Sequence, residues 1–165
     1  MIVVADASRL NYLIQIQAEE LLQRLFGQVL VPHAVMQELR HPRAPEAVAV
    51  WISRIPSWIE VRAVATPEDL LLQALDPGER EAIVLAESAH ADLLLIDERQ
   101  GRLEARRRGI TTTGTLGVLL AAGGRGFANP EVLFARLLQE TSFRSTPEVR
   151  GSFAAECLKI RCERP

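Results

Sequence analysis

Short apolar runs alternate along the chain with longer segments in which apolar positions recur every three or four residues. The runs are typical of strands buried in a sheet, and the longer segments are typical of amphipathic helices. The predicted strands are residues 2–5, 29–32, 58–64, 92–96 and 110–112. The predicted helices are residues 10–26, 33–40, 45–54, 76–90, 98–108, 115–122 and 129–140. This alternation predicts an α/β fold with a mainly parallel sheet and helices on both faces.

Two glycines mark helix ends, and the end of the alternation of strands and helices marks the limit of the domain. Gly27 and Gly109 follow two of the predicted helices, and glycine accepts the left-handed backbone that closes a helix. The alternating elements fill residues 1–140, which we expect to form one domain. The mixed, basic tail 141–165 lacks the pattern, and we expect it to pack on the domain or to mediate assembly.

The composition excludes several classes of protein. Apolar residues make up 48% of the 165 residues, enough to close one hydrophobic core. No apolar stretch reaches the ~20 residues of a membrane span. The N-terminus lacks the pattern of a signal peptide, so we expect a cytoplasmic protein. The net charge of −2 argues against nucleic-acid binding through overall charge alone. Cys157 and Cys162 cannot complete a zinc site, and we expect them to be free thiols.

Acidic residues follow two of the predicted strands. Asp6 comes directly after the first strand, and Asp97 and Glu98 come after the run "LLLI". Open parallel sheets bind ligands at the carboxyl ends of their strands, so we expect Asp6 and Asp97 to meet there. Glu38 and Glu81, on two predicted helices, are further candidates for the same place.

Carboxylates placed close together raise one another's pKa, and a fold tolerates such a cluster when a cation compensates the charge. Mg²⁺ and Mn²⁺ prefer oxygen ligands of this kind. A metal held by carboxylates can activate water and stabilise a phosphodiester during hydrolysis. The acidic residues therefore predict metal-assisted hydrolysis of a phosphodiester.

Four segments, taken in order, resemble the PIN-domain family. They are "VVADAS", "VPHAVMQEL", "GEREAIVLAE", and "LLLIDERQGRLEARRRG" with the following "GTLGVLL". The resemblance covers roughly residues 2–124 and is nearest to VapC-like prokaryotic proteins. It implies a three-layer α/β/α fold around a mainly parallel central sheet.

The resemblance also implies an activity, a cofactor and partners. The implied activity is a Mg²⁺- or Mn²⁺-dependent ribonuclease that cuts single-stranded RNA, as the toxin of a toxin–antitoxin pair. The residues that match the family's catalytic and metal-binding acids are Asp6, Glu38, Glu81 and Asp97. Ser8 matches the hydroxyl residue that supports the first acid or a metal-bound water. A homodimer and a neighbouring antitoxin protein are the implied partners.

The neighbours of these acids have competing structural roles. With Asp76 as N-cap, Glu79 can close a capping box, so we assign Glu79 to the helix start and Glu81 to the site. Glu98 suits the first turn of the next helix, with a supporting role in the site. Arg99 and Arg102 follow the acids and are candidates for contacts to RNA phosphates.

Two other classes of function compete with the nuclease. Receiver domains and aspartyl phosphatases also place an Asp after the first strand. The phosphatases need a second Asp where this chain has Ser8, and a receiver needs a late-strand lysine, whereas Lys159 lies in the tail. The other alternative is a catalytically weak or inactive PIN-like module that binds nucleic acid or a protein partner.

Overall fold

A parallel sheet of five strands lies at the centre of the part of the chain that the computed structural model describes, residues 1–162. The strands are β1 (Val3–Ala5), β2 (Val29–Pro32), β3 (Ile59–Arg62), β4 (Leu93–Leu95) and β5 (Thr112–Thr113). Their order is β3-β2-β1-β4-β5, and each neighbouring pair is parallel. The parallel sheet predicted from the sequence is confirmed.

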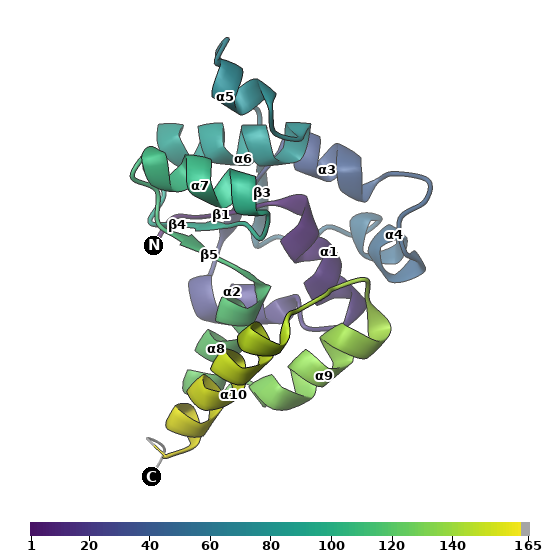
Figure 1. The fold of residues 1–165 in the computed structure, drawn as a ribbon. Helices are drawn as coiled ribbons and strands as arrows, with labels where there is room; N and C mark the ends of the chain where they lie inside the picture. The colour runs from purple at the N-terminus through teal and green to yellow at the C-terminus, as the bar shows by residue number, and fades with distance from the viewer. Residues whose placement is uncertain (163–165) are drawn as a thin grey trace.

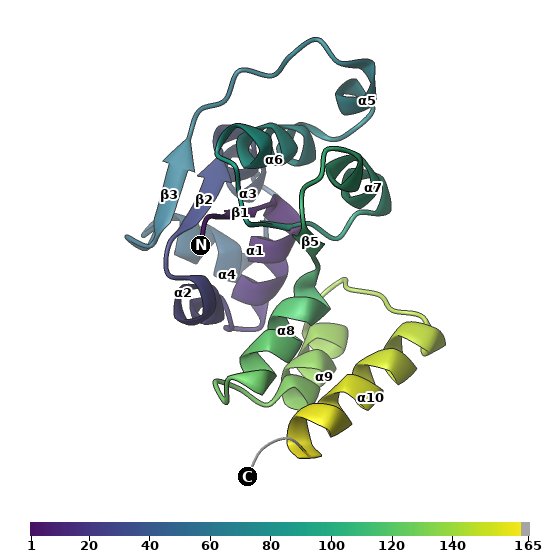
Figure 2. The same ribbon diagram turned by 90° about the vertical axis from the view of Figure 1, so that its left-hand side faces the viewer.

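Helices cover both faces of this sheet. They are α1 (Ala7–Gln15), α2 (Glu20–Phe26), α3 (His33–Leu39), α4 (Glu46–Ile52), α5 (Leu70–Gln73), α6 (Pro77–Ser88), α7 (Arg99–Arg107), α8 (Thr115–Gly124), α9 (Pro130–Glu140) and α10 (Pro147–Cys162). In Figure 1, α6 and α7 lie on one side of the sheet, and α1 and α2 lie on the other. Figure 2 shows the same layers after a quarter turn, with α8, α9 and α10 beyond the second layer.

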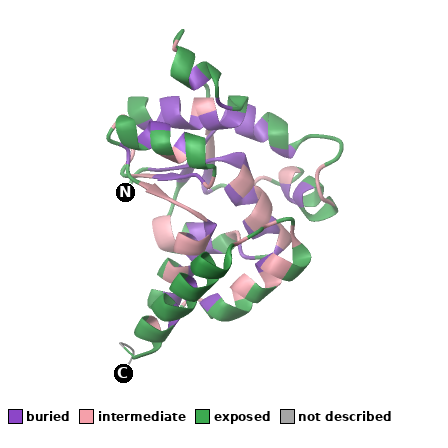
Figure 3. Cartoon of the chain, in the orientation of Figure 1, coloured by how far each residue is buried: buried purple, intermediate pink, exposed green. Residues whose placement is uncertain are grey.

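The strand side chains alternate between two hydrophobic cores. Val3 and Ala5 belong to the larger core, with residues of α1, α2, α4 and α8. Val4, between them, belongs to the smaller core, with residues of α6 and α7. The neighbouring strands follow the same alternation, since Leu94 lies in the smaller core and Leu95 in the larger one. Both faces of the central strands are therefore buried (Figure 3), as the three-layer α/β/α prediction requires.

The predicted single helix over residues 10–26 is wrong, because the chain forms α1 and α2 in its place. Gln17 has a left-handed backbone, with φ 54°. The backbone N–H of Ala18 donates to the carbonyl of Leu13 at 2.8 Å, which closes α1. The break keeps Ile14 and Leu22 in the same core on two short helices.

Two further helices extend the predicted set. The four-residue helix α5 is absent from the sequence prediction, and its Leu72 is fully buried in the smaller core. The segment after residue 140 forms α10, which packs against α8 and α9 (Figure 1). Phe153 and Cys157 of α10 are buried in the larger core. A role of this segment in assembly stays a prediction.

Candidate functional site

The strands β1 and β4 carry Asp6 and Asp97 to the same edge of the sheet. The two strands are parallel neighbours, with Ala5 paired to Leu95. The backbone N–H of Asp6 donates to the carbonyl of Leu95 at 3.1 Å. Two acids far apart in the sequence therefore lie at the carboxyl ends of adjacent strands, where open parallel sheets bind ligands.

Asp6 is a buried carboxylate with one free oxygen. Its Oδ1 accepts a hydrogen bond of 2.6 Å from the backbone N–H of Ala7, which makes Asp6 the N-cap of α1. Its Oδ2 is buried and has no hydrogen-bond partner within residues 1–162. Burial raises the pKa of Asp6, while the positive charge of Arg9 and the backbone N–H groups of Ala7 and Ser8 oppose this rise. The free oxygen leaves Asp6 able to bind a further donor or a cation.

Arg9 is a fully buried guanidinium beside Asp97. Its Nη1 forms an ion pair with Oδ2 of Asp97 and lies 3.4 Å from Oγ1 of Thr115. Its Nε and Nη2 are buried without hydrogen-bond partners in the described part of the chain. Burial lowers the pKa of Arg9 to about 9, against the opposing effect of Asp6, so Arg9 is cationic at neutral pH. The chain thus places one positive charge of its own among the acids.

Thr115 and Gly114 fix the position of Asp97. The hydroxyl of Thr115 donates to Oδ2 of Asp97 at 2.7 Å, and its backbone N–H lies 3.3 Å from Oδ1. A Cβ on Gly114 would lie only 2.6 Å from Oδ1 of Asp97, so this close approach requires glycine. Both residues belong to the "TGTLG" segment at the start of α8, which therefore orients the carboxylate.

Glu38 and Glu81 join α3 and α6 by reciprocal hydrogen bonds. Oε1 of Glu38, on α3, accepts from the backbone N–H of Gly78 at 2.8 Å, in the first turn of α6. Oε2 of Glu81, on α6, accepts from the backbone N–H of Ala34 at 2.9 Å, in the first turn of α3. Burial raises the pKa of Glu38, the Gly78 N–H lowers it, and the charge of Asp6 raises it again. Each glutamate thus has a helix-capping role.

Glu79 lies deeper than Glu81, although we assigned it only to the helix start. It is 7% exposed, and its Oε1 is buried without a hydrogen-bond partner in residues 1–162. A Cβ on Gly101 would lie 3.1 Å from this oxygen, so Glu79 packs against α7. Burial, and then the charge of Asp6, raise the pKa of Glu79 to about 7, while the Asp76 N–H lowers it. The Asp76 side chain makes no capping hydrogen bond, so the full capping box predicted from the sequence is not formed, and Glu79 lies close enough to Asp6 for that charge to act on it.

Ser8 and Glu98 border the same edge. Ser8 lies beside Asp97 and Glu98 in the lining of a cavity, and its backbone N–H helps to lower the pKa of Asp6. Glu98 is exposed at the start of α7 and makes no capping hydrogen bond with its side chain. Its negative charge adds to the forces that raise the pKa of Asp6. The expected supporting roles of these two residues stay predictions.

The acids do not converge as a single preformed metal cage. Within residues 1–162, no three Asp, Glu, His or Cys side chains are placed to hold one ion. Asp6 and Asp97 follow the ends of adjacent strands, whereas Glu38 and Glu81 face the first turns of α6 and α3. The structure therefore places the two aspartates at the same sheet edge and engages the two glutamates in the α3–α6 contact, where Glu38 is still close enough to Asp6 for its pKa to be raised by that charge.

Arginines of α7 surround Asp97 on the outer side. Arg99, Arg102 and Arg106 line a shallow cavity together with Asp97. Arg108 differs from these residues, since its guanidinium forms ion pairs with three acids and serves to hold the fold. The three acids are Asp69, Glu87 and Glu104. Arg99 and Arg102 are thus placed beside the acids, as phosphate contacts require.

Arg9 and Glu79 are the site residues that the sequence prediction missed. Arg9 lies three residues after Asp6, a spacing that puts both on one face of a helix. It is also the only charged residue between Asp6 and Glu19. Glu79 precedes Glu81 by two residues in a segment rich in alanine and branched residues, where a carboxylate calls for a partner. The sequence thus gives the spacing of Arg9 and Glu79 and the residues around them, but it does not give the direction in which either side chain points.

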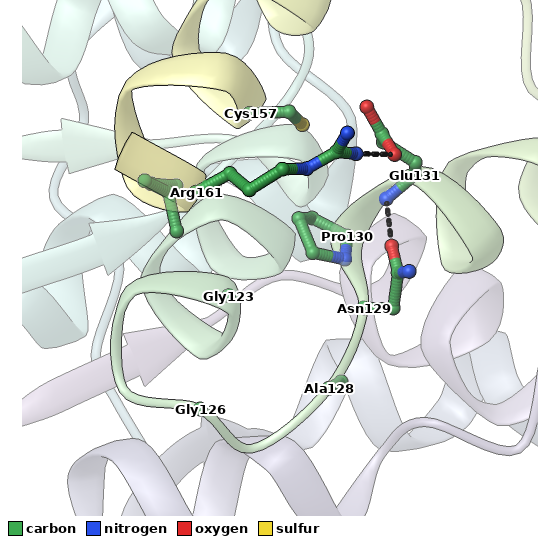
Figure 4. Close-up of a pocket in the computed structure, with 9 residues that line it drawn as sticks. Gly123, Gly126, Ala128, Asn129, Pro130, Glu131, Cys157 and Arg161 are labelled. Carbon is green, nitrogen blue, oxygen red and sulfur yellow. Dashed lines mark hydrogen bonds and ion pairs between the residues drawn. The ribbon is translucent and has the colours of Figure 1, made fainter. Parts of the chain in front are cut away.

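A separate cavity lies far from these acids, between α8, α9 and α10 (Figure 4). It has a volume of about 370 Å³ and is bordered by Pro130 and Cys157. Its Glu131 forms an ion pair of 2.6 Å with Arg161, so the charge of the cavity is already compensated. Asn129 caps α9 through the backbone N–H of Glu131 at 3.0 Å. These contacts are structural, and the cavity has none of the acids of the sheet edge.

Comparison with known proteins identifies one family. A family model described as a PIN domain matches residues 2–157. No curated protein and no solved structure matches the chain significantly. Within residues 1–162, no helix is both long and apolar enough to cross a membrane.

Proposed function

This chain belongs to the PIN-domain family, and on that premise we propose that it is a metal-dependent endonuclease that cleaves single-stranded RNA. PIN domains are typically nucleases and generally use divalent metal ions. The specific choice of RNA, and of Mg²⁺ or Mn²⁺, is part of the proposal. It is supported by the acidic sheet edge and by the arginines beside it.

The observation that carries the proposal is the free oxygen of Asp6. A buried carboxylate oxygen without a partner is costly in a folded protein. A bound cation removes this cost, because it supplies the missing charge and coordination. Asp97 follows the adjacent strand, and its side chain is 25% exposed, so this second acid is accessible to an ion and to a substrate. These features fit a divalent ion.

Asp6 and Asp97 would hold the ion, and Glu38 and Glu81 are the further ligands that the family resemblance implies. Glu79 is an additional candidate because of its own free oxygen. When bound, Mg²⁺ or Mn²⁺ supplies activation of water and stabilisation of charge on the phosphodiester. The chain itself supplies orientation, since Ala7 fixes one oxygen of Asp6 and Thr115 fixes Asp97.

Arg99 and Arg102 would bind the RNA backbone. Both lie on α7 in the cavity that contains Asp97, so a phosphate held there lies next to the acids. Guanidinium groups bind phosphates through two parallel hydrogen bonds. In this proposal, Ser8 and Glu98 border the path of the substrate.

The ion pair between Arg9 and Asp97 favours a second candidate function. Because Arg9 already compensates one carboxylate, the site has less need of a metal ion. A chain whose own arginine neutralises the charge of Asp97 fits a weak or inactive PIN-like module that binds RNA or a protein. Cleavage assays separate the two functions.

The proposal includes biological partners that follow from the VapC-like resemblance alone. These partners are an antitoxin protein and a second copy of the chain, and the proposed setting is the cytoplasm. Light scattering of the purified protein measures its oligomeric state. Co-expression with the product of a neighbouring gene tests for a stable antitoxin complex.

The decisive assay incubates the purified chain with labelled single-stranded RNA. Cleavage is expected with Mn²⁺ or Mg²⁺ and not with EDTA, and it is expected to be lost in Asp6→Asn. Asp92→Asn is the matched control, because Asp92 precedes β4 at the opposite edge of the sheet, where it accepts from the Ile2 N–H. Metal-independent cleavage, or equal cleavage by Asp6→Asn, contradicts the proposal. A protein that binds RNA but cuts none supports the binding module.

A further inference from the structure

A large cavity adjoins the acidic edge on the side of the C-terminal helices. Its volume is about 740 Å³, within the usual range for ligand pockets of about 300–1,000 Å³. Asp97 and Glu98 form part of its lining, so the cavity continues directly from the candidate site. Its opposite wall is the segment 142–146, which joins α9 to α10. Residues far apart in the sequence thus enclose one space.

Two guanidinium groups border this cavity without ion-pair partners. Arg102 comes from α7 and Arg144 from the segment before α10. Within residues 1–162 neither forms an ion pair, and Arg144 donates only to the backbone carbonyl of Phe143, at 3.1 Å. Arg107, Arg108 and Arg136 are instead paired with acids, as Arg136 with Glu140 shows. Free guanidinium groups on both walls favour an anionic ligand.

Two aromatic rings form part of the cavity wall. Tyr12 of α1 and Phe143 meet edge to face, with ring centroids 5.5 Å apart and planes at 87°. Both residues are only partly buried. Aromatic rings bordering a groove are the usual stacking platform for bases of single-stranded RNA.

Hydrogen bonds hold Phe143 in place without a ligand. Its backbone N–H donates to Oγ1 of Thr141 at 3.0 Å, and this hydroxyl donates to the carbonyl of Leu137 at 2.6 Å. The segment is therefore tied to the last turn of α9. Because the backbone at Phe143 is already held, its ring loses less conformational freedom when a base stacks on it.

We propose that this cavity is a nucleotide subsite of single-stranded RNA, in which a base stacks on Tyr12 and Phe143 while Arg102 and Arg144 bind its flanking phosphates. The inference rests on the proposed function, because the occupant is the substrate of the same site. The combination of rings and free guanidinium groups selects a nucleotide over an apolar ligand. The adjacent phosphodiester then lies beside Asp97.

Binding of a fluorescein-labelled single-stranded RNA of eight nucleotides, measured by anisotropy in EDTA, tests the subsite without cleavage. Phe143→Leu keeps an apolar side chain but removes the ring, and Arg144→Gln removes the charge. Each is expected to raise Kd by about five- to fiftyfold, as loss of one stacked base or one phosphate contact does. The matched control Arg136→Gln removes a paired arginine of α9, and its Kd is expected to stay within about twofold of the wild type, because Arg136 does not line the cavity and loss of its ion pair with Glu140 costs little stability.

The outcomes separate the subsite from the nuclease. Unchanged RNA affinity in Phe143→Leu and Arg144→Gln overturns the subsite, and metal-dependent cleavage by the wild type would still support the nuclease. Weakened binding in both variants, with no cleavage by the wild type, supports the subsite and contradicts the nuclease. If the wild type binds no RNA, the subsite proposal is overturned. This holds even if the same residues are found to bind a protein partner. Circular dichroism confirms that each variant is folded.

Discussion

Arg9 and Asp97 form an ion pair at the carboxyl end of β4, with the guanidinium fully buried and the carboxylate 25% exposed. The pair lies next to Asp6, whose second carboxylate oxygen is buried without a partner in the described residues. The site therefore contains a cation supplied by the chain and an oxygen of Asp6 that is still free. Arg9 and a divalent ion are expected to compete for Asp97.

Arg9→Met tests this competition. Removal of the guanidinium leaves Asp97 without its counter-charge, so the metal-free protein is expected to lose about 1–2 kcal/mol of unfolding free energy, less than for a fully buried pair because Asp97 is 25% exposed. The freed carboxylate is expected to bind Mn²⁺ about tenfold more tightly, as measured by electron paramagnetic resonance of free Mn²⁺. Arg54→Met is the control, because Arg54 is exposed after α4 and lines neither of the cavities that contain Asp97. Unchanged Mn²⁺ affinity in Arg9→Met would show that the two cations do not compete.

Glu79 is expected to make the stability of the metal-free protein depend on pH. Its pKa of about 7 in the folded state lies above the ordinary value of 4.5. The folded state therefore keeps the proton longer than the unfolded state, and stability falls as the pH rises from about 4.5 to 7. Glu79→Gln has no proton to lose, so in EDTA its melting temperature should exceed that of the wild type above pH 7 and converge with it near pH 5. A constant difference at all pH values contradicts this role.

The reciprocal contact between α3 and α6 predicts a structural effect of Glu38 and Glu81. Each carboxylate accepts from an N–H group in the first turn of the other helix, where negative charge also favours the helix dipole. Glu38→Ala and Glu81→Ala are each expected to lower the free energy of unfolding by about 1 kcal/mol in EDTA. Gln37→Ala, an exposed neighbour on α3, should have no such effect. Unchanged metal-free stability would mean that these glutamates serve the site alone.

The glycine before α8 is expected to matter for the site more than for the fold. In Gly114→Ala, the added Cβ would lie 2.6 Å from Oδ1 of Asp97 and push the carboxylate away from Thr115. RNA cleavage and Mn²⁺ affinity should fall by about tenfold or more, with a melting temperature within a few degrees of the wild type. Gly124→Ala is the control, since nothing lies within 4 Å of its added Cβ. Full cleavage by Gly114→Ala contradicts the assigned position of Asp97.

The hydrophobic pattern was sufficient to predict the sheet and most helices. Runs such as "IVVA" and "LLLI" give strands because they are buried on both faces, and the observed alternation between two cores follows from this burial. The break at Gln17 could not be predicted, because no glycine or proline interrupts the helical pattern there. The short helix α5 was missed because its four residues make little more than one helical turn, too few for a repeating apolar pattern.

The sequence predicted the part of the site that depends on the order of the strands. The positions of Asp6 and Asp97 after two strands follow from the sequence, and the parallel pairing of β1 with β4 places them at one edge. The choice between Glu79 and Glu81 depends on which way each side chain leaves α6, and a difference of two residues turns it to another face. The buried position of Arg9 depends on the packing of α1 against α8, which the sequence pattern does not contain.

Anomalous scattering from crystals soaked in Mn²⁺ shows directly whether Asp6 and Asp97 hold a divalent ion at the carboxyl edge of the sheet. An anomalous peak is expected at about 2.0–2.3 Å from a carboxylate oxygen of Asp6, with Asp97 as a second ligand, and no peak is expected in crystals of Asp6→Asn. A peak elsewhere in the molecule, or an unoccupied edge in crystals of protein that cleaves RNA with Mn²⁺, contradicts this assignment.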